Sequence, residues 1–485
     1  MWKKDSSCPE LWTRPWRQSF SVLGGIFLLW GVAVAMIACS DDDGKKSIKT
    51  GGLTTESDSG AVAGTDGGTD GGSSAADDSA TASGNDPQAE SETPPALPSR
   101  CTTHIVAQKL SGPGSGMMPS LSSQGDDMMA AFSYNSKEPN AQTKIQLGYY
   151  DAEANKWLTA YPFEDAVMSA RSAIFQSADS RGLVWLEGRA AWTPGCSADT
   201  PDACQSDVAF ATLTGGQLNQ STPIRVSPNG GASGRPAAVP VADGWVVIFG
   251  QSISGDVSIL SAKVTSDGTV STPQIISGDY LPSRALEISA ASLNDGTSDH
   301  IIAVWRGDEQ DIDFVKLDTT GTPIAPSAVL EDGANFSPRI TAGATAFLVS
   351  FGQNTPNDAE IFTRVVDTAG HPISEKNRIT WTDSPIVESY VAYTPQLGYA
   401  ITWLSTKANG NASCVDPVCK TKVFAAPLDT TGALSAAPIL VSEGNTDLNP
   451  CSAVTLGATT TTWMTAYEIL RNLRQQILYS TFTCQ

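Results

Sequence analysis

Residues 245–249 read WVVIF, and this short apolar strand ending in an aromatic side chain recurs from residue 101 onward. The seven copies are MMAAF (128–132), GLVW (182–185), WVVIF (245–249), IIAVW (301–305), FLVSF (347–351), AITW (400–403) and MTAY (464–467). Their aromatic residues are Phe132, Trp185, Phe249, Trp305, Phe351, Trp403 and Tyr467, spaced 46 to 64 residues apart. Because repetition of one unit is the mark of a repeat architecture, the copies indicate a modular fold.

The copies share further strands around this segment. A second strand follows each copy, and several of these strands run into an Asp-x-x-Gly turn, as in Asp318–Gly321, Asp367–Gly370 and Asp429–Gly432. An Asp that bonds its own main chain, before a Gly with positive φ, favours a hairpin. Four antiparallel strands in seven copies predict an all-β, seven-bladed β-propeller over residues 101–485. We expect the recurrent aromatic residues to pack between blades.

The ends of this region complement one another. The last copy, 451–485, contains three strands, and the missing strand occurs at 103–111 as THIVAQKLS. We therefore expect the N-terminal strand to form the outer edge of the final blade. In this arrangement Cys101 and Cys484 stand where a hairpin would join two strands, which predicts a disulfide bond between them.

The composition narrows the classes of function. The chain has 51 acidic and 30 basic residues, a net charge of −21, and only 17% of its residues are charged. Nucleic-acid binding requires clustered Lys and Arg on one face of a protein. The strong acidic excess of this chain therefore argues against a nucleic-acid-binding protein. The sequence lacks, in the context that their chemistry needs, the catalytic and nucleotide-binding motifs GxSxG, HExxH, GxxxxGK[ST] and GxGxxG. Motifs therefore predict no catalytic residue, metal site or cofactor.

The N-terminus carries an export signal. Lys3, Lys4, Arg14 and Arg17 precede an uncharged apolar run from Ser19 to Ala38, which is typical of a secretory signal peptide. The run ends in Met36-Ile37-Ala38-Cys39, which resembles the lipobox of bacterial lipoproteins. The resemblance implies cleavage after residue 38 and lipidation of Cys39, including palmitate. An uncleaved signal anchor is the alternative, because 20 apolar residues can span a bilayer.

The resemblance to Gram-negative envelope lipoproteins also implies a location. Ser40 follows the lipidated position, which favours the outer membrane over the inner one. Residues 39–100 are acidic, rich in Gly, Ser and Asp, and free of aromatic residues. Such a segment cannot bury enough apolar surface to order itself, so we expect a disordered tether between the lipid anchor and the propeller.

The remaining cysteines fit an oxidising compartment. Cys196 and Cys204 flank one short segment, and Cys414 and Cys419 flank another, in the two copies with the longest spacing. We expect each pair to form a local disulfide that closes an insertion. Zinc is excluded because the three His residues have no finger-like spacing with these pairs. Cys451 is left free or pairs between molecules.

Two further segments are candidate sites. Residues 265–269 (TSDGT) resemble the Asp-box of propeller sialidases, but the segment lacks the closing aromatic residue and is interpreted as a turn. Asp308, Glu309, Asp311 and Asp313 form a carboxylate cluster that could bind Ca²⁺ or act as an acid and base pair. A solvated hairpin tip is the simpler interpretation. Together with Trp192, this cluster is our predicted binding face, opposite the Cys101–Cys484 link.

These observations predict a lipid-anchored surface or periplasmic protein whose propeller is a binding or scaffold module. Its partners would be the membrane, through the lipid, and a protein or glycan. The alternative is a propeller glycoside hydrolase or lyase acting on envelope or extracellular polysaccharide. That activity requires two carboxylates and a basic residue that converge at the channel mouth.

Overall fold

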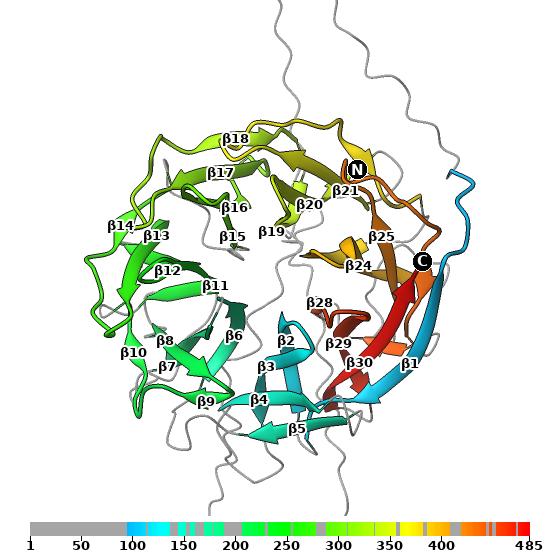
Figure 1. Ribbon diagram of the computed structural model, residues 1–485, viewed down its shortest axis with the longest axis horizontal. Helices are drawn as coiled ribbons and strands as arrows, with labels where there is room; N and C mark the ends of the chain where they lie inside the picture. The colour runs from blue at the N-terminus through cyan, green and yellow to red at the C-terminus, as the bar shows by residue number, and fades with distance from the viewer. Residues whose placement is uncertain are drawn as a thin grey trace, which may run out of the picture. The chain divides into compact units, whose positions relative to one another are not determined.

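The structure is a computed structural model. It describes residues 95–485 except 113–114, 136–143, 152–155, 161–168, 178, 189–205, 228–230, 254–255, 278–287, 308, 334, 356–358, 382–385, 408–418, 443–445, 449–452 and 472–473. The described residues form seven antiparallel sheets of four principal strands each, arranged in a ring (Figure 1). None of the described residues belongs to a helix that could cross a membrane. The predicted seven-bladed β-propeller is confirmed.

Each blade runs outward from an inner to an outer strand. Blade 1 contains β2 (Ser115–Gln124), β3 (Asp127–Asn135), β4 (Lys144–Asp151) and β5 (Lys156–Ala160). Blade 2 contains β6 (Ser169–Gln176), β7 (Arg181–Gly188), β8 (Ser206–Thr214) and β10 (Ile224–Arg225), with β9 (Gln217–Leu218) beside β8. Blade 3 contains β11 (Ala232–Val241), β12 (Gly244–Ile253), β13 (Asp256–Thr265) and β14 (Gln274–Ile275).

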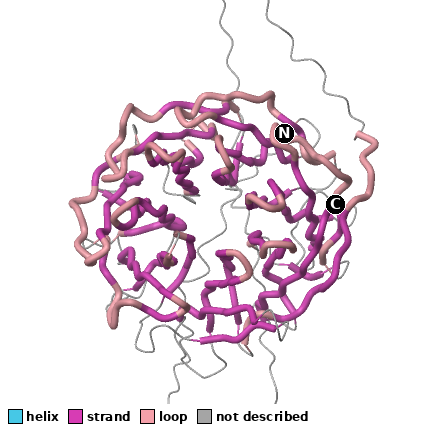
Figure 2. Tube along the Cα trace, in the orientation of Figure 1, coloured by secondary structure: helices cyan, strands magenta, loops and turns pink. Residues whose placement is uncertain are grey.

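The remaining blades repeat this order (Figure 1). Figure 2 shows that the described part of the ring consists of strands and the loops between them. Blade 4 contains β15 (Ser289–Asn294), β16 (Asp299–Arg306), β17 (Ile312–Leu317) and β18 (Ala328–Glu331). Blade 5 contains β19 (Asn335–Ala342), β20 (Phe347–Asn354), β21 (Ala359–Val366) and β22 (Asn377–Arg378). Blade 6 contains β23 (Ile386–Thr394), β24 (Gly398–Lys407), β25 (Cys419–Leu428) and β26 (Ile439–Leu440), with β27 (Thr446–Leu448) beside β25. Blade 7 contains β28 (Val454–Ala458), β29 (Trp463–Arg471), β30 (Arg474–Cys484) and β1 (Cys101–Lys109).

The hydrophobic core lies between the blades. In the described residues it forms seven clusters, and each cluster joins side chains of two neighbouring blades. Every recurrent aromatic residue is buried in one of them, from Phe132 between blades 7 and 1 to Tyr467 between blades 6 and 7. Because one blade cannot bury both faces of its sheet, each copy depends on its neighbours. The aromatic positions therefore have the packing role predicted for them.

The two ends of the chain close the ring. Strand β1 pairs antiparallel with β30, so the N-terminal strand is the outer strand of the last blade. Cys101 lies directly opposite Cys484, and the two form a disulfide bond across a sequence separation of 383 residues. Both predictions about closure are confirmed.

The alternation of strand direction defines two faces. We call the face at which each inner strand begins the front face, and the other the back face. The strand ends that flank residues 189–205 and 408–418 lie at the front face, as does the turn at 307–311. Cys101 begins an outer strand and Cys484 ends a third strand, so their disulfide lies at the back face.

Glycine turns at the back face hold neighbouring blades together. In blades 2 to 6, a glycine between the third and fourth strands packs against the preceding blade, and we call these the turn–blade contacts. A Cβ on Gly370, whose φ is 92°, would lie 2.1 Å from Phe314 of blade 4. Thr363 Oγ1 donates a hydrogen bond of 2.6 Å to Gly432 O, and Ser261 Oγ donates one of 2.5 Å to Gly321 O. These close approaches require glycine.

Candidate functional site

Several predicted residues lie outside the described part of the chain. They are Cys39, Trp192, Cys196, Cys204, Asp308, Cys414 and Cys451. The main chain of Cys419 begins β25, but the placement of its side chain is not described. Lipidation and both local disulfides therefore stay predictions.

In the described part of the carboxylate cluster, Glu309 and Asp311 lie in the front-face connection that leads into β17, and Asp313 lies in β17 itself. Glu309 is exposed, and Asp311 Oδ1 accepts a hydrogen bond of 2.7 Å from the main-chain N of Gly333. No group of three His, Cys, Asp or Glu side chains that could hold a metal ion is found among the described residues. Asp311 thus has a structural role, connecting this segment to the loop that enters blade 5.

The segment 265–269 is a turn, as predicted. Asp267 Oδ1 accepts hydrogen bonds from Thr265 Oγ1 at 2.5 Å and from Thr269 N at 3.0 Å. These hydrogen bonds lower the pKa of Asp267 from its usual value. A carboxylate satisfied within its own turn at the back face has a structural role, in the same place as Asp318 in blade 4.

A Ser, His and Asp also meet at a turn of the back face, but not in the geometry of a catalytic triad. His300 Nε2 lies 2.8 Å from Asp295 Oδ2 and 3.1 Å from Ser298 Oγ. A triad uses one ring nitrogen for the carboxylate and the other for the nucleophile. Here a single nitrogen contacts both partners, so the arrangement cannot relay a proton from Ser298 to Asp295.

A group of described polar residues connects several blades around the central channel at the front face. In β2, β6, β11 and β19, the inner strand has a register shift opposite the recurrent aromatic residue. Met118 and Ser337 lie in two of these bulges with φ of 52° and 49°. Left-handed backbone at non-glycine residues is strained and concentrates at functional sites. We call the part of the central channel at the level of these bulges the channel mouth.

Charged side chains connect the inner strands at the channel mouth. Arg339 Nη2 of blade 5 donates a hydrogen bond of 2.5 Å to Glu388 Oε1 of blade 6. Glu388 Oε2 accepts a hydrogen bond of 3.3 Å from Val454 N of blade 7. Arg339 and Glu388 are both buried, so they form a buried ion pair that is further supported by a main-chain donor.

The same network continues into blade 1. Glu468, on the second strand of blade 7, accepts a hydrogen bond of 3.1 Å from Met118 N. Its carboxyl group is fully buried, and this desolvation, with a smaller contribution from the Glu388 carboxylate, raises its pKa to about 8. Glu468 is therefore mostly protonated at neutral pH.

Arg235 connects blade 3 to two other blades. Its Nη2 donates hydrogen bonds to Pro119 O of blade 1 at 2.8 Å and to Ser172 O of blade 2 at 3.4 Å. The guanidinium group therefore reaches past the adjacent blade to a non-adjacent one. It keeps its positive charge, because Arg does not deprotonate in proteins.

Arg235 and Arg339 both line a small cavity of about 30 Å³. Blades 1 to 6 contribute to its wall, which contains Ser120, Ala173, Phe175, Arg235, Pro236, Ala237, Ile288, Ser289, Arg339 and Tyr390. The charged residues of this wall are both arginines, although the whole chain has a net charge of −21. The channel mouth can thus bind an anionic or hydrogen-bond-accepting group.

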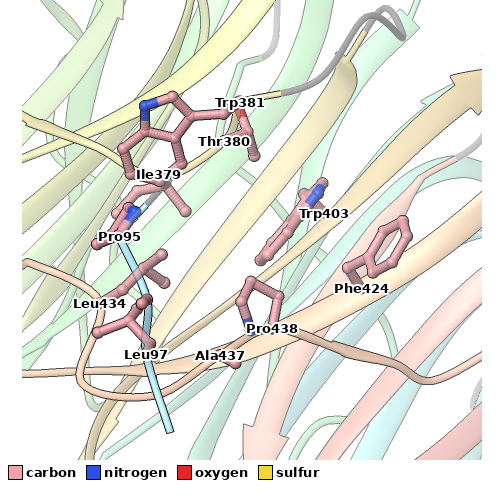
Figure 3. A pocket seen from close by; sticks show the side chains of 11 residues that line it. Pro95, Leu97, Ile379, Thr380, Trp381, Trp403, Phe424, Leu434, Ala437 and Pro438 are labelled. Carbon is pink, nitrogen blue, oxygen red and sulfur yellow. The ribbon is translucent and has the colours of Figure 1, made fainter. Parts of the chain in front are cut away.

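A second, larger cavity lies between blades 5 and 6 (Figure 3). Its volume is about 400 Å³, and its wall includes Trp381, Trp403, Phe424 and the N-terminal residues Pro95 and Leu97. No lining residue is charged. Ala437 N donates a hydrogen bond of 3.0 Å to Pro98 O, so this wall also anchors the segment that leads into β1.

Sequence reasoning missed the channel mouth. Of the predicted front-face residues, Glu309 and Asp311 lie beside β17 of blade 4, whereas Arg235, Arg339, Glu388 and Glu468 lie on β11, β19, β23 and β29. The available signal was a Pro next to the start of several inner strands, as in Met118-Pro119, Arg235-Pro236 and Pro338-Arg339. Proline in a strand indicates an edge or a bulge.

No family model matches the sequence, and comparison with curated proteins gives no match. Among solved structures, the chain is similar to a protein of unknown function from Dyadobacter fermentans, with 10% identity, a TM-score of 0.45, and coverage of 79% of this chain and 99% of that one. A mutant Trypanosoma rangeli sialidase displaying trans-sialidase activity has 9% identity, a TM-score of 0.43, and coverage of 79% and 59%. The polysaccharide lyase Uly1 has 10% identity, a TM-score of 0.42, and coverage of 77% and 90%. Similarities at this level carry no inference about activity.

Proposed function

We propose that this chain is a lipid-anchored envelope protein whose propeller binds polysaccharide at the channel mouth. The observation that supports binding there is the cavity at the channel mouth, whose wall comes from six blades and carries Arg235 and Arg339. A concave site with a few converging polar groups is the usual form of a ligand site. Sugars present many hydroxyl and carboxyl oxygens, which suit this wall of hydrogen-bond donors.

The anchor completes the proposal. Cys39 would carry the lipid, and residues 40–100 would hold the propeller away from the outer membrane. Because the Cys101–Cys484 bond lies at the back face, the tether would reach the ring on the side opposite the channel mouth. The binding site would then be accessible to polymers beyond the anchor.

A hydrolase or lyase acting on polysaccharide is the second candidate. The observation in its favour is the connection of two carboxyl groups, Glu388 and Glu468, with the basic residue Arg339. Glu468, with its raised pKa, could act as an acid, and Glu388, which pairs with Arg339, could act as a base. Both carboxyl groups accept main-chain hydrogen bonds and are buried, which favours the binding function over the catalytic one.

The test uses the full-length protein in detergent on a polysaccharide array, together with a reducing-end and unsaturated-product assay on the same polymers. The proposal expects binding without product release, and binding that is lost in Arg339→Gln. Arg364→Gln is the matched control, because Arg364, on the third strand of blade 5, pairs with Glu331 on the outer strand of blade 4 and lies outside the channel mouth. Release of product by the wild-type protein, with loss of that release in Glu388→Gln, would establish the hydrolase or lyase instead. Absence of binding to every polymer, with capture of a protein partner instead, would refute both.

A further inference from the structure

Two serine hydroxyls that line the cavity at the channel mouth each accept a main-chain hydrogen bond. Ser120 Oγ accepts a hydrogen bond of 3.2 Å from Ile174 N, and Ser289 Oγ accepts one of 3.1 Å from Ile340 N. A hydroxyl that accepts a main-chain N–H keeps its own hydrogen to donate. The orientation of both serines therefore favours a ligand atom that accepts hydrogen bonds.

The other polar groups of this wall are also hydrogen-bond donors. Arg235 and Arg339 carry donors only, and the Tyr390 hydroxyl can donate as well. Among the described residues, Arg235 and Arg339 are the only charged side chains that line this cavity, and Glu388, which pairs with Arg339, lies outside its wall. An acceptor with a negative charge is thus favoured over a neutral one.

The cavity is small. About 30 Å³ exceeds the roughly 10–15 Å³ that one water molecule needs, so the cavity admits only a small polar group at the end of a ligand. A carboxylate presents two oxygens in one plane, whereas a sulfate ester presents three.

We infer that the channel mouth is a subsite for the carboxylate of an acidic sugar, held between Arg235 and Arg339, with Ser120, Ser289 and Tyr390 as further donors. This inference rests on the proposed polysaccharide binding and specifies its ligand class. The remainder of the sugar chain would extend over the front face.

The experiment compares three uronate oligomers, from pectin, alginate and hyaluronate, with their methyl esters and with a sulfated galactose oligomer. Binding to the full-length protein is measured by calorimetry at neutral pH. We expect at least one uronate to bind, its ester to bind at least about tenfold more weakly, and the sulfated oligomer to bind more weakly than the uronate, since a charge-assisted hydrogen bond is lost or misplaced.

Variants test the named residues. Arg235→Gln should weaken binding of the uronate at least about tenfold without changing binding of its ester, and Arg235→Lys should fall between. Tyr390→Phe gives a milder loss and tests the site if Arg235→Gln fails to fold. The control is Arg225→Gln, an exposed arginine on β10 that pairs with Asp207.

The outcomes separate the carboxylate subsite from the proposed polysaccharide binding. Equal binding of acid and ester, preference for the sulfated oligomer, or an unchanged affinity in Arg235→Gln and Tyr390→Phe would overturn the carboxylate subsite. Binding of neutral polymers on the array would still support the proposed function in that case. Failure of every uronate to bind overturns the subsite, and failure of the whole array overturns the proposed function.

Discussion

Removing the disulfide bond that closes the ring should lower stability by an amount set by the length of the closed loop. The double variant Cys101→Ser/Cys484→Ser deletes a covalent link across 383 residues. In the chain-entropy model, a loop of this length contributes about 6 kcal/mol by restricting the unfolded chain. Measured losses of native disulfides are commonly about 2–5 kcal/mol.

The native ring itself should persist in this variant. Strand β1 keeps its pairing with β30 from Thr102 to Lys109, and it keeps the main-chain hydrogen bond of 2.8 Å from Leu110 N to Ile477 O. An unfolding entropy of about 2.1 cal/mol/K per residue over roughly 385 residues gives about 0.8 kcal/mol/K. A loss of about 2–6 kcal/mol then corresponds to a fall of about 2–7 °C in the melting temperature.

Differential scanning calorimetry of the full-length protein measures this shift. The matched control is Thr102→Ala/Thr483→Ala, which changes the neighbouring pair in the same register and leaves the disulfide intact. A fall of less than 1 °C in the cysteine variant, or an equal fall in the threonine control, would refute the claim that the covalent closure stabilises the ring.

Two further changes test the buried carboxyl group and the back-face turns. The pKa of Glu468 is raised to about 8, above its ordinary value of 4.5, so its contribution to stability should fall by about 1.4 kcal/mol per pH unit between these values. Glu468→Gln should remove this slope in melting temperatures measured from pH 5 to 9, and an identical slope in the variant would contradict the assignment. Gly370→Ala should destabilise by at least about 2 kcal/mol in urea titration, because the new Cβ meets Phe314 in addition to adopting positive φ. Gly398→Ala, where φ is also positive but no atom lies within 4 Å, should cost about 1 kcal/mol, and equal losses would show that the contact is unimportant.

The architecture was predictable because it depends on repeated local patterns. The aromatic residue that ends each copy had to be buried, and a single blade offers no interior, so its recurrence specified packing between blades. The shortage of one strand after Cys451 and its presence at 103–111 predicted the closure. The register of Cys101 opposite Cys484 followed from these two facts.

The channel mouth could not be predicted in the same way. Met118 and Glu468 are 350 residues apart, and Arg235 and Pro119 are 116 apart, so no local spacing connects them. Their contacts exist only because seven inner strands surround one axis. The carboxylates that sequence reasoning selected, at 308–313, cluster along the chain, whereas those that converge in space come from different blades.

The turn–blade contacts all occur on the side of the ring away from the channel mouth. There, Gly321 and Gly432 set how closely each blade approaches the one before it. The angular position of a blade is therefore decided by residues that no ligand at the other side would touch. Segments at the front face can lengthen, shorten or exchange their side chains without altering how many blades complete the circle, so ligand preference can diverge while the scaffold stays constant.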